Sequence, residues 1–113
     1  MSNPIRGEVW YVNLDPPHAL EQAGERPCLI VSDDRYNRGR SGRVIILPLT
    51  TRPQLPFTVA VKPPEGGLTR SSYIICDQIR AINKDRLKTH RGAVSRRTMA
   101  QVDSLMKALL SVP

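Results

Sequence analysis

Three short polar segments contain the side chains best suited to bind a phosphate group or to move a proton. In the first, residues 21–27, an acid, an amide and a guanidinium stand directly before an apolar run: Glu21, Gln22 and Arg26. A guanidinium binds phosphate oxygens through a bidentate fork. An arginine at the entrance of a strand is also held firmly, because Pro27 restricts the local backbone. Taken alone, the segment also fits an arginine that only forms an ion pair with Glu21 or Glu25.

The other two polar segments interrupt strongly apolar runs. Residues 50–52 place two hydroxyls and a guanidinium directly after an apolar strand: Thr50, Thr51 and Arg52. Residues 76–80 hold a carboxyl, an amide and a guanidinium within an apolar stretch: Asp77, Gln78 and Arg80. Ordinary explanations also fit, because threonine has a high β-propensity and buried polar groups are usually satisfied by the backbone.

Other familiar catalytic motifs are absent from the sequence. Cys and His do not occur in metal-ligand spacing, and there is no dinucleotide fingerprint, Walker loop or serine-nucleophile elbow. We therefore expect no metal site and no cofactor. Of the two histidines, His90 fits a surface position near a strand. His18 lies in a proline-rich loop before the first polar segment, which makes it a further candidate for proton transfer.

The charge of the chain favours a polyanionic partner. Seventeen Lys and Arg face ten Asp and Glu, which gives a net charge of +7 and a pI near 10.1. Of these seventeen, 13 are Arg and four are Lys. Such a surface suits nucleic acid, an acidic protein or a membrane surface, although a GC-rich genome also replaces Lys by Arg.

The polar segments are expected to lie at the ends of short strands. Apolar runs rich in β-branched and aromatic residues predict strands at residues 9–14, 28–31, 44–49, 57–61 and 72–82. Proline and glycine predict a loop at residues 15–25 and a turn at 63–67. A short helical turn near residues 33–37 would have Ser32 as its N-cap.

The chain is expected to end in a helix. Ser95 is its predicted N-cap, and apolar residues recur at helical spacing: Met99, Val102, Met106, Leu109 and Leu110. Five or six short strands followed by one helix indicate a mostly β, α+β fold, an antiparallel barrel with the helix covering one side. The length of 113 residues predicts one domain, residues 1–113.

The sequence contains no apolar signal segment and no run long enough to span a membrane. Cys28 and Cys76 each lie inside an apolar run, where a thiol behaves as a small buried hydrophobe. These observations predict a cytoplasmic protein with reduced thiols.

The order of these segments resembles the MazF/PemK family of toxin endoribonucleases, which includes Kid and belongs to type II toxin–antitoxin systems. The resemblance runs from residue 6 to about residue 110 and includes the final helix. It rests on motifs at matching intervals: Arg6-Gly7-Glu8-Val9-Trp10, Leu14-Asp15-Pro16, Glu21-Gln22-Ala23-Gly24, Arg26-Pro27, Leu29-Ile30-Val31-Ser32, Pro48-Leu49-Thr50, Phe57, Gly67 and Asp77-Gln78-Ile79-Arg80. It implies an SH3-like, plasmid-toxin barrel that works as a homodimer and cleaves single-stranded RNA at a short sequence without metal.

The resemblance also implies roles for individual residues. The family's catalytic arginine falls on Arg26, its catalytic threonine on Thr50 and its acid on Glu21. RNA supplies its own nucleophile, the 2′-OH, so the enzyme must orient it, neutralise the charge that grows on phosphorus and protonate the leaving oxygen. The implied products are a 2′,3′-cyclic phosphate and a 5′-OH. The chain departs from the family at Ala19-Leu20, where a Gly-Ser pair is usual, which changes the loop before Glu21.

Proteins read single-stranded RNA by stacking on bases and by hydrogen bonds to base edges. Aromatic residues make up only 4% of the chain, so arginine planes and backbone groups are expected to replace an aromatic platform. The candidates for substrate binding are His18, Gln22, Thr51, Arg52, Gln78, Arg80 and Arg86, together with the arginines of residues 35–43.

Two other functions remain alternatives. A non-catalytic toxin of the same fold that poisons gyrase, like CcdB, would need a tryptophan near its C-terminus, whereas Trp10 is the single tryptophan here. An RNA-binding barrel without chemistry would have no need of both Arg26 and Thr50. The family resemblance further implies a cognate antitoxin whose acidic, flexible segment covers the basic groove, a contact that the net charge of +7 favours.

Overall fold

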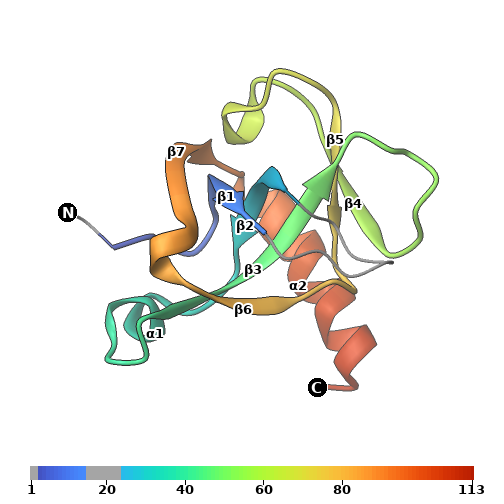
Figure 1. The fold of residues 1–113 in the computed structure, drawn as a ribbon. Coiled ribbons are helices and arrows are strands. Elements are labelled where there is room, and N and C mark those ends of the chain that lie inside the picture. The colour runs from blue at the N-terminus through green and yellow to red at the C-terminus, as the bar shows by residue number, and fades with distance from the viewer. Residues whose placement is uncertain (1–2, 15–23) are drawn as a thin grey trace.

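The computed structural model describes residues 3–14 and 24–113 of the chain. In these residues, one antiparallel seven-stranded sheet is accompanied by two helices, as Figure 1 shows. The strands are β1 (Glu8–Asn13), β2 (Glu25–Ile30), β3 (Arg43–Thr50), β4 (Thr58–Val61), β5 (Ser72–Ile75), β6 (Arg80–Asn83) and β7 (Leu87–Ala93). The helices are α1 (Asp34–Arg38) and α2 (Arg96–Leu110), with 3-10 turns η1 (Glu65–Gly67) and η2 (Lys84–Arg86).

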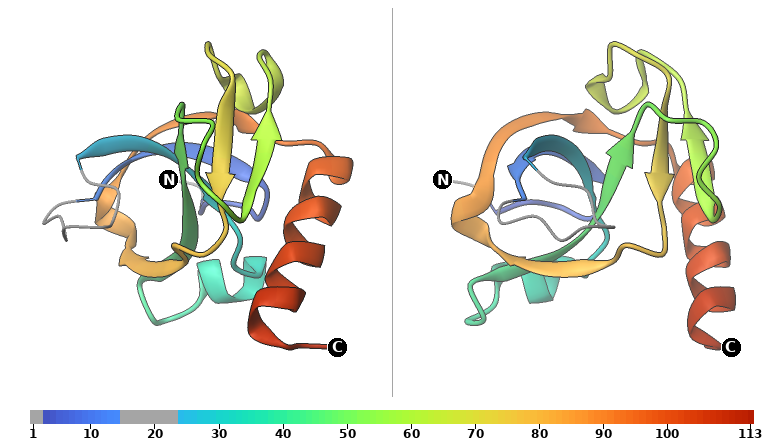
Figure 2. Two further views of the ribbon diagram at one scale, coloured as in Figure 1. Left: turned by 90° about the vertical axis from the view of Figure 1, so that its right-hand side faces the viewer. Right: turned by 45° about the vertical axis from the view of Figure 1, so that its right-hand side comes forward.

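Strand β3 connects the two parts of the sheet. One of its edges pairs with β2, and the other pairs first with β6 and then, toward its end, with β5. On the far side of β2, β1 pairs with both β2 and β7. Strands β1, β2, β3, β6 and β7 therefore form a small barrel, and β4 and β5 extend from it beside α2, as Figure 2 shows.

The two faces of β1, β2 and β3 bury two separate cores, because side chains alternate along a strand. Inside the barrel lie Val12, Leu14, Cys28, Ile30, Val44, Ile46 and Ile82. On the opposite face, residues of β1–β3 pack against β4, β5 and α2: Val9, Leu29, Leu47, Leu49, Val59, Val61, Leu68, Ile74, Cys76 and Val102. Both faces of these strands are therefore apolar, which explains the unbroken apolar runs in their sequences.

The predicted fold class and the predicted final helix are confirmed. Helix α2 begins after Ser95, whose side chain accepts a hydrogen bond from the backbone N–H of Thr98. Val102 is fully buried, whereas Leu110 at the end of the apolar stripe is 57% exposed. In the part of the chain that the structure describes, no helix is long and apolar enough to cross a membrane.

Three details of the predicted elements were wrong. The N-cap of α1 is Asp33, whose carboxylate accepts from the backbone N–H of Arg35, while the Ser32 hydroxyl accepts from the N–H of Ile45. The strand predicted at residues 72–82 is interrupted at residues 76–79, where the pairing with β3 shifts register between β5 and β6. Strand β7 was not predicted, because its sequence is polar and it is mostly exposed.

Candidate active site

Arg26 and Thr50 come from neighbouring strands and line the same cavity. Arg26 lies near the start of β2, where it pairs with Val12 of β1. The ladder between β2 and β3 ends with Cys28 opposite Pro48, and two further residues in the same register would bring Arg26 opposite Thr50. The cavity has a volume of about 210 Å³ and is lined by Tyr11, Glu25, Arg26, Pro27, Leu49, Thr50, Thr51, Arg70 and Ser72.

The Thr50 hydroxyl is fixed by the end of its strand. At this point β3 has left β2 and pairs with β5, with Thr50 opposite Tyr73. The side chain is almost completely buried, and its Oγ1 accepts a hydrogen bond of 3.2 Å from the backbone N–H of Arg52. A hydroxyl that accepts in this way still has its own proton to donate, so Thr50 can bind a phosphate oxygen.

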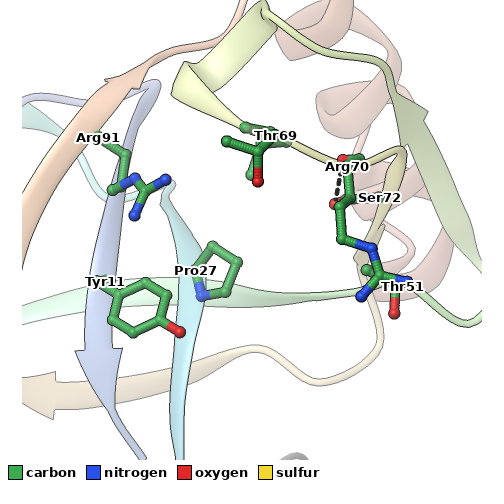
Figure 3. A pocket seen from close by; sticks show the side chains of 8 residues that line it. Tyr11, Pro27, Thr51, Thr69, Arg70, Ser72 and Arg91 are labelled. Atoms are coloured by element: carbon green, nitrogen blue, oxygen red, sulfur yellow. Dashed lines mark hydrogen bonds between the residues drawn. The ribbon is translucent and has the colours of Figure 1, made fainter.

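A second cavity of about 240 Å³ adjoins the first. It is lined by Tyr11, Pro27, Thr51, Leu68, Thr69, Arg70, Ser72 and Arg91, and five of these residues also line the first cavity: Tyr11, Pro27, Thr51, Arg70 and Ser72. The two cavities are therefore parts of one depression, which we refer to as the trough. Figure 3 shows Tyr11 and Arg91 on one side of the second cavity, Arg70 and Thr51 on the other, and Pro27 between them.

The trough is strongly cationic. Three guanidiniums line it, those of Arg26, Arg70 and Arg91, and Glu25 is the only carboxylate among its described lining residues. Arg70 is exposed, and its guanidinium forms no hydrogen bond or ion pair with any residue that the structure describes. Such a distribution favours a polyanion, because an arginine without a carboxylate partner can direct its donors toward phosphate.

Cys28 lies in the barrel core below the same strands. Burial raises the pKa of its thiol to about 12, although the charges of Arg80 and Arg26 oppose this effect. At neutral pH the thiol therefore stays protonated and acts as a core residue rather than as a nucleophile.

The structure separates some of the predicted site residues from the trough. Arg80 and Arg86 line another cavity, of about 150 Å³, together with Arg43, Ala81, Ile82 and Asn83. Arg86 also donates from Nη1 to the backbone oxygen of Asn13, at 3.4 Å. Arg52 and Gln78 line none of these three cavities. Of the predicted residues, Arg26, Thr50 and Thr51 come together, whereas His18, Glu21 and Gln22 lie outside the described residues.

Sequence reasoning missed most of the polar side chains that line the second cavity, namely Tyr11, Thr69, Arg70, Ser72 and Arg91. The polar run at residues 69–72 directly precedes a strand, just as the run at 50–52 directly follows one. Because β3 and β5 are antiparallel and paired at Thr50 and Tyr73, these two runs must meet. The composition of residues 69–72 was a usable signal, whereas Tyr11 and Arg91 depend on the pairing of β1 with β7.

His90 takes part in a contact away from the trough. Its Nε2 lies 3.2 Å from Oε2 of Glu8, and its ring stacks on Trp10 with the ring centres 5.3 Å apart. The indole N–H of Trp10 donates to the same Glu8 carboxylate, at 3.0 Å. His90, in β7, therefore has both of these partners on the neighbouring strand β1. Among residues 3–14 and 24–113, no group of three or more His, Cys, Asp or Glu side chains could hold a metal ion.

Comparisons with known proteins agree with this architecture. Residues 5–110 match the family model described as "PemK-like, MazF-like toxin of type II toxin-antitoxin system". The chain is 34% identical over 113 residues to endoribonuclease MazF9 of Mycobacterium tuberculosis (strain ATCC 25618 / H37Rv), covering 95% of this chain and 96% of that protein. It is 31% identical over 110 residues to endoribonuclease MazF of Staphylococcus epidermidis, covering 95% and 91%.

Solved structures show the same similarity. An endoribonuclease in complex with its cognate antitoxin, from a mycobacterial species, matches with a TM-score of 0.79 and 32% identity over 100% of this chain and 98% of that one. MazF of Deinococcus radiodurans matches with a TM-score of 0.85 and 26% identity, over 98% and 99%. The chain therefore belongs to the PemK-like, MazF-like toxins of type II toxin–antitoxin systems.

Proposed function

We propose that this toxin is a sequence-specific endoribonuclease that cleaves single-stranded RNA in the trough, without a metal ion. The observation that carries the proposal is the shared cavity of Arg26 and Thr50, which lie 24 residues apart in sequence (50 minus 26). Each is held by a different strand at the point where the strand begins or ends. Relatives of 34% and 31% identity bear the name endoribonuclease, which supports the same activity here.

The reaction uses the 2′-OH of the RNA as its nucleophile. Its oxygen forms a bond to phosphorus while the bond from phosphorus to the 5′-oxygen breaks, leaving a 2′,3′-cyclic phosphate and a 5′-OH. Negative charge grows on the phosphate oxygens during this step, and a positioned guanidinium stabilises such charge. We assign this role to Arg26, and we assign to Thr50 a hydrogen bond from its hydroxyl to a phosphate oxygen.

Two protons must move in this reaction. The 2′-OH loses a proton and the leaving 5′-oxygen gains one. A guanidinium is a poor base at its usual pKa, so we propose that Glu21 either accepts the 2′-OH proton or holds Arg26 in place. His18 is the second candidate for proton transfer. The pH–rate profile of Glu21→Gln separates the two roles of Glu21. If Glu21 is the general base, the variant should lose the rise in rate that follows deprotonation of the base; if Glu21 only holds Arg26, the shape of the profile should not change.

The remaining predicted residues are proposed to bind the rest of the RNA chain. Thr51 lines both cavities of the trough. Arg80 and Arg86, with Arg43, offer a second cationic cavity on which phosphates farther along the chain could rest. Arg52, Gln78 and Gln22 are proposed to contact bases or sugars.

We further propose that the toxin acts as a homodimer and binds a cognate antitoxin. A stable monomer in light scattering would contradict the dimer. The 32% identical mycobacterial endoribonuclease is in complex with its antitoxin, and an acidic antitoxin segment would compete with RNA for the three arginines of the trough.

We place this single domain, residues 1–113, in the cytoplasm, where Cys28 and Cys76 stay reduced.

The test is a cleavage assay on a long, unstructured RNA in the presence of EDTA. Wild-type toxin should cut at discrete positions and leave cyclic phosphate ends, and a removal of all metal should not slow it. Arg26→Ala and Thr50→Ala should each lose activity while remaining folded. Failure of the folded wild type to cut across many sequences would favour a gyrase-directed or RNA-binding role, which a supercoiling assay would separate.

A further inference from the structure

The catalytic pair occupies only one end of the trough. Arg26 and Thr50 line the first cavity and are absent from the described lining of the second. The second cavity, of about 240 Å³, is thus a built depression that the cleavage step does not use. Because it shares five lining residues with the first, a polymer whose scissile phosphate lies at Arg26 must pass it or enter it.

One wall of the second cavity joins an aromatic ring and a guanidinium. The guanidinium carbon of Arg91 lies 5.7 Å from the centre of the Tyr11 ring, and Tyr11 is half-buried. Aromatic rings and arginine planes are the two kinds of surface on which proteins stack unpaired bases. Both kinds are present on one wall, although aromatic residues are few in the chain as a whole.

The position of Arg91 is set by tight backbone packing. Its Nη2 donates to the Gly67 carbonyl oxygen, at 3.4 Å. Gly67 has a φ of +67°, and a Cβ at this residue would lie 2.0 Å from the Arg91 carbonyl oxygen. Only glycine allows η1 to approach β7 so closely. The wall formed by Tyr11 and Arg91 is therefore organised before any ligand arrives.

The opposite wall supplies an arginine for phosphate. Figure 3 shows Arg70 facing Tyr11 and Arg91 across Pro27. The Ser72 hydroxyl donates to the Arg70 carbonyl oxygen, at 2.9 Å, which orders the backbone that bears this side chain. As described above, the Arg70 guanidinium has no partner among the described residues, so binding a phosphate would break no existing ion pair.

We propose that the second cavity binds one nucleotide of the RNA, adjacent to the scissile phosphate. Its base stacks on the wall of Tyr11 and Arg91, and its phosphate binds Arg70. Tyr11 and Arg91 thereby bind a base by stacking and Arg70 positions the chain, while Arg26 and Thr50 act on the bond that breaks. The inference rests on the proposed RNA cleavage, and its test is chosen so that the two can fail separately.

The experiment deletes bases from the substrate one at a time. An RNA oligonucleotide that contains a mapped cut site is made with an abasic residue at each position near the cut, and KM and kcat are measured for wild type and variants. For wild type, one abasic position should raise KM by about 5- to 150-fold, the range expected for loss of one stacked base. In Tyr11→Ala the same deletion should change KM by less than about twofold, because the stacking surface is already lost.

Two further variants separate stacking from charge. Tyr11→Phe keeps the ring and should retain the wild-type response to base deletion. Arg70→Ala should raise KM more than it lowers kcat, and should reduce the salt dependence of binding by about one phosphate contact. Lys107→Ala is the matched control, because it removes one positive charge from α2, outside both cavities, and it should leave KM unchanged.

A binding measurement keeps the inference independent of cleavage. Oligonucleotides with 2′-deoxy residues at the cut lack the nucleophile, and their affinities are compared across the same abasic positions. Suppose that wild type cleaves RNA, but that every abasic position raises KM as much in Tyr11→Ala as in wild type. The subsite is then overturned and the proposed activity stands. If wild type cleaves nothing, the abasic scan is made by binding alone on an unmodified single-stranded RNA; coupling of one abasic position to Tyr11 would then keep nucleotide binding by the second cavity and overturn the proposed cleavage. Binding of an acidic peptide at this wall, with no coupling to any base, would also overturn the subsite.

Discussion

Replacing Thr50 by valine should separate catalysis from folding. Valine keeps the β-branched shape that suits the end of β3, and it replaces the hydroxyl by a methyl group of similar size. That hydroxyl accepts one hydrogen bond, 3.2 Å from the backbone N–H of Arg52. Because Arg52 is exposed, water can replace the lost acceptor.

The structure therefore predicts a small effect on stability and a large effect on activity. Loss of one such hydrogen bond costs about 0.5–1.5 kcal/mol, which corresponds to a fall in Tm of about 2–6 °C for a domain of this size. Loss of a donor to the reacting phosphate should lower kcat by about 100- to 1,000-fold. These two effects differ enough that partial unfolding cannot be mistaken for loss of chemistry.

The assay is single-turnover cleavage of a mapped site in EDTA, with thermal unfolding measured on the same samples. Thr58→Val is the matched control, because it removes a hydroxyl that bonds the Leu55 carbonyl oxygen, at 3.4 Å, outside the trough. This control should lose a similar amount of stability and keep its activity. A Thr50→Val protein that cleaves within about twofold of wild type would refute the role assigned to the Thr50 hydroxyl.

Two further predictions concern the framework around the site. Asn37 is fully buried and donates from Nδ2 to the Pro4 and Ser32 carbonyl oxygens, at 3.2 and 3.1 Å. Asn37→Ala should therefore lower the free energy of unfolding, measured in denaturant titrations, by about 3 kcal/mol. The exposed control Asn83→Ala should change the free energy of unfolding by less than about 0.5 kcal/mol. Equal effects of the two variants would contradict this account of the buried amide. Burial by itself raises the pKa of Glu65, but hydrogen bonds from the Thr98 side chain and the Ser95 backbone outweigh it, so the net pKa is lowered. A carboxyl with a lowered pKa in the folded state stabilises the fold above its unfolded pKa and loses this contribution as the pH falls through its folded pKa. The Tm difference between wild type and Glu65→Gln should thus be largest near pH 7 and shrink below about pH 4, and a difference independent of pH would show that the carboxylate charge plays no part.

Much of the fold could be predicted because the apolar residues that several elements bury recur at simple intervals in the sequence. The stripe that includes Met99 and Val102 identified α2, and Ser95 identified its start. The apolar runs around Cys28 and Val44 identified two central strands. Strand β7 was missed because its side chains face solvent on most positions, so no hydrophobic periodicity marks it. The register shift after Ile75 was missed for a different reason, since it arises from pairing with β3 rather than from local sequence.

The candidate site was only partly predictable for a related reason. Arg26 and Thr50 lie in distinctive motifs, which is why the family resemblance could assign them. Arg70 and Arg91 are ordinary surface arginines by their local sequence, and only the pairing of β3 with β5 and of β1 with β7 brings them to the trough. Conversely, Arg80 and Arg86 were expected to bind substrate but lie in a separate cavity.

The sequence by itself determined the class of the molecule: its basic charge, its mostly β fold with a final helix and its family. Its motifs also singled out Arg26 and Thr50 as the proposed catalytic pair. These are properties of composition, local periodicity and motif order, which need no knowledge of which strands pair. Only the tertiary structure decided which cations share a surface, because strand pairing joins residues such as Thr50 and Tyr73 that are distant in the chain. The Tyr11 and Arg91 wall exists for the same reason. Arg91 lies where the pairing of β7 with β1 shifts register, between Gly92 opposite Val9 and His90 opposite Trp10, and only this pairing brings its guanidinium to the same cavity as the Tyr11 ring.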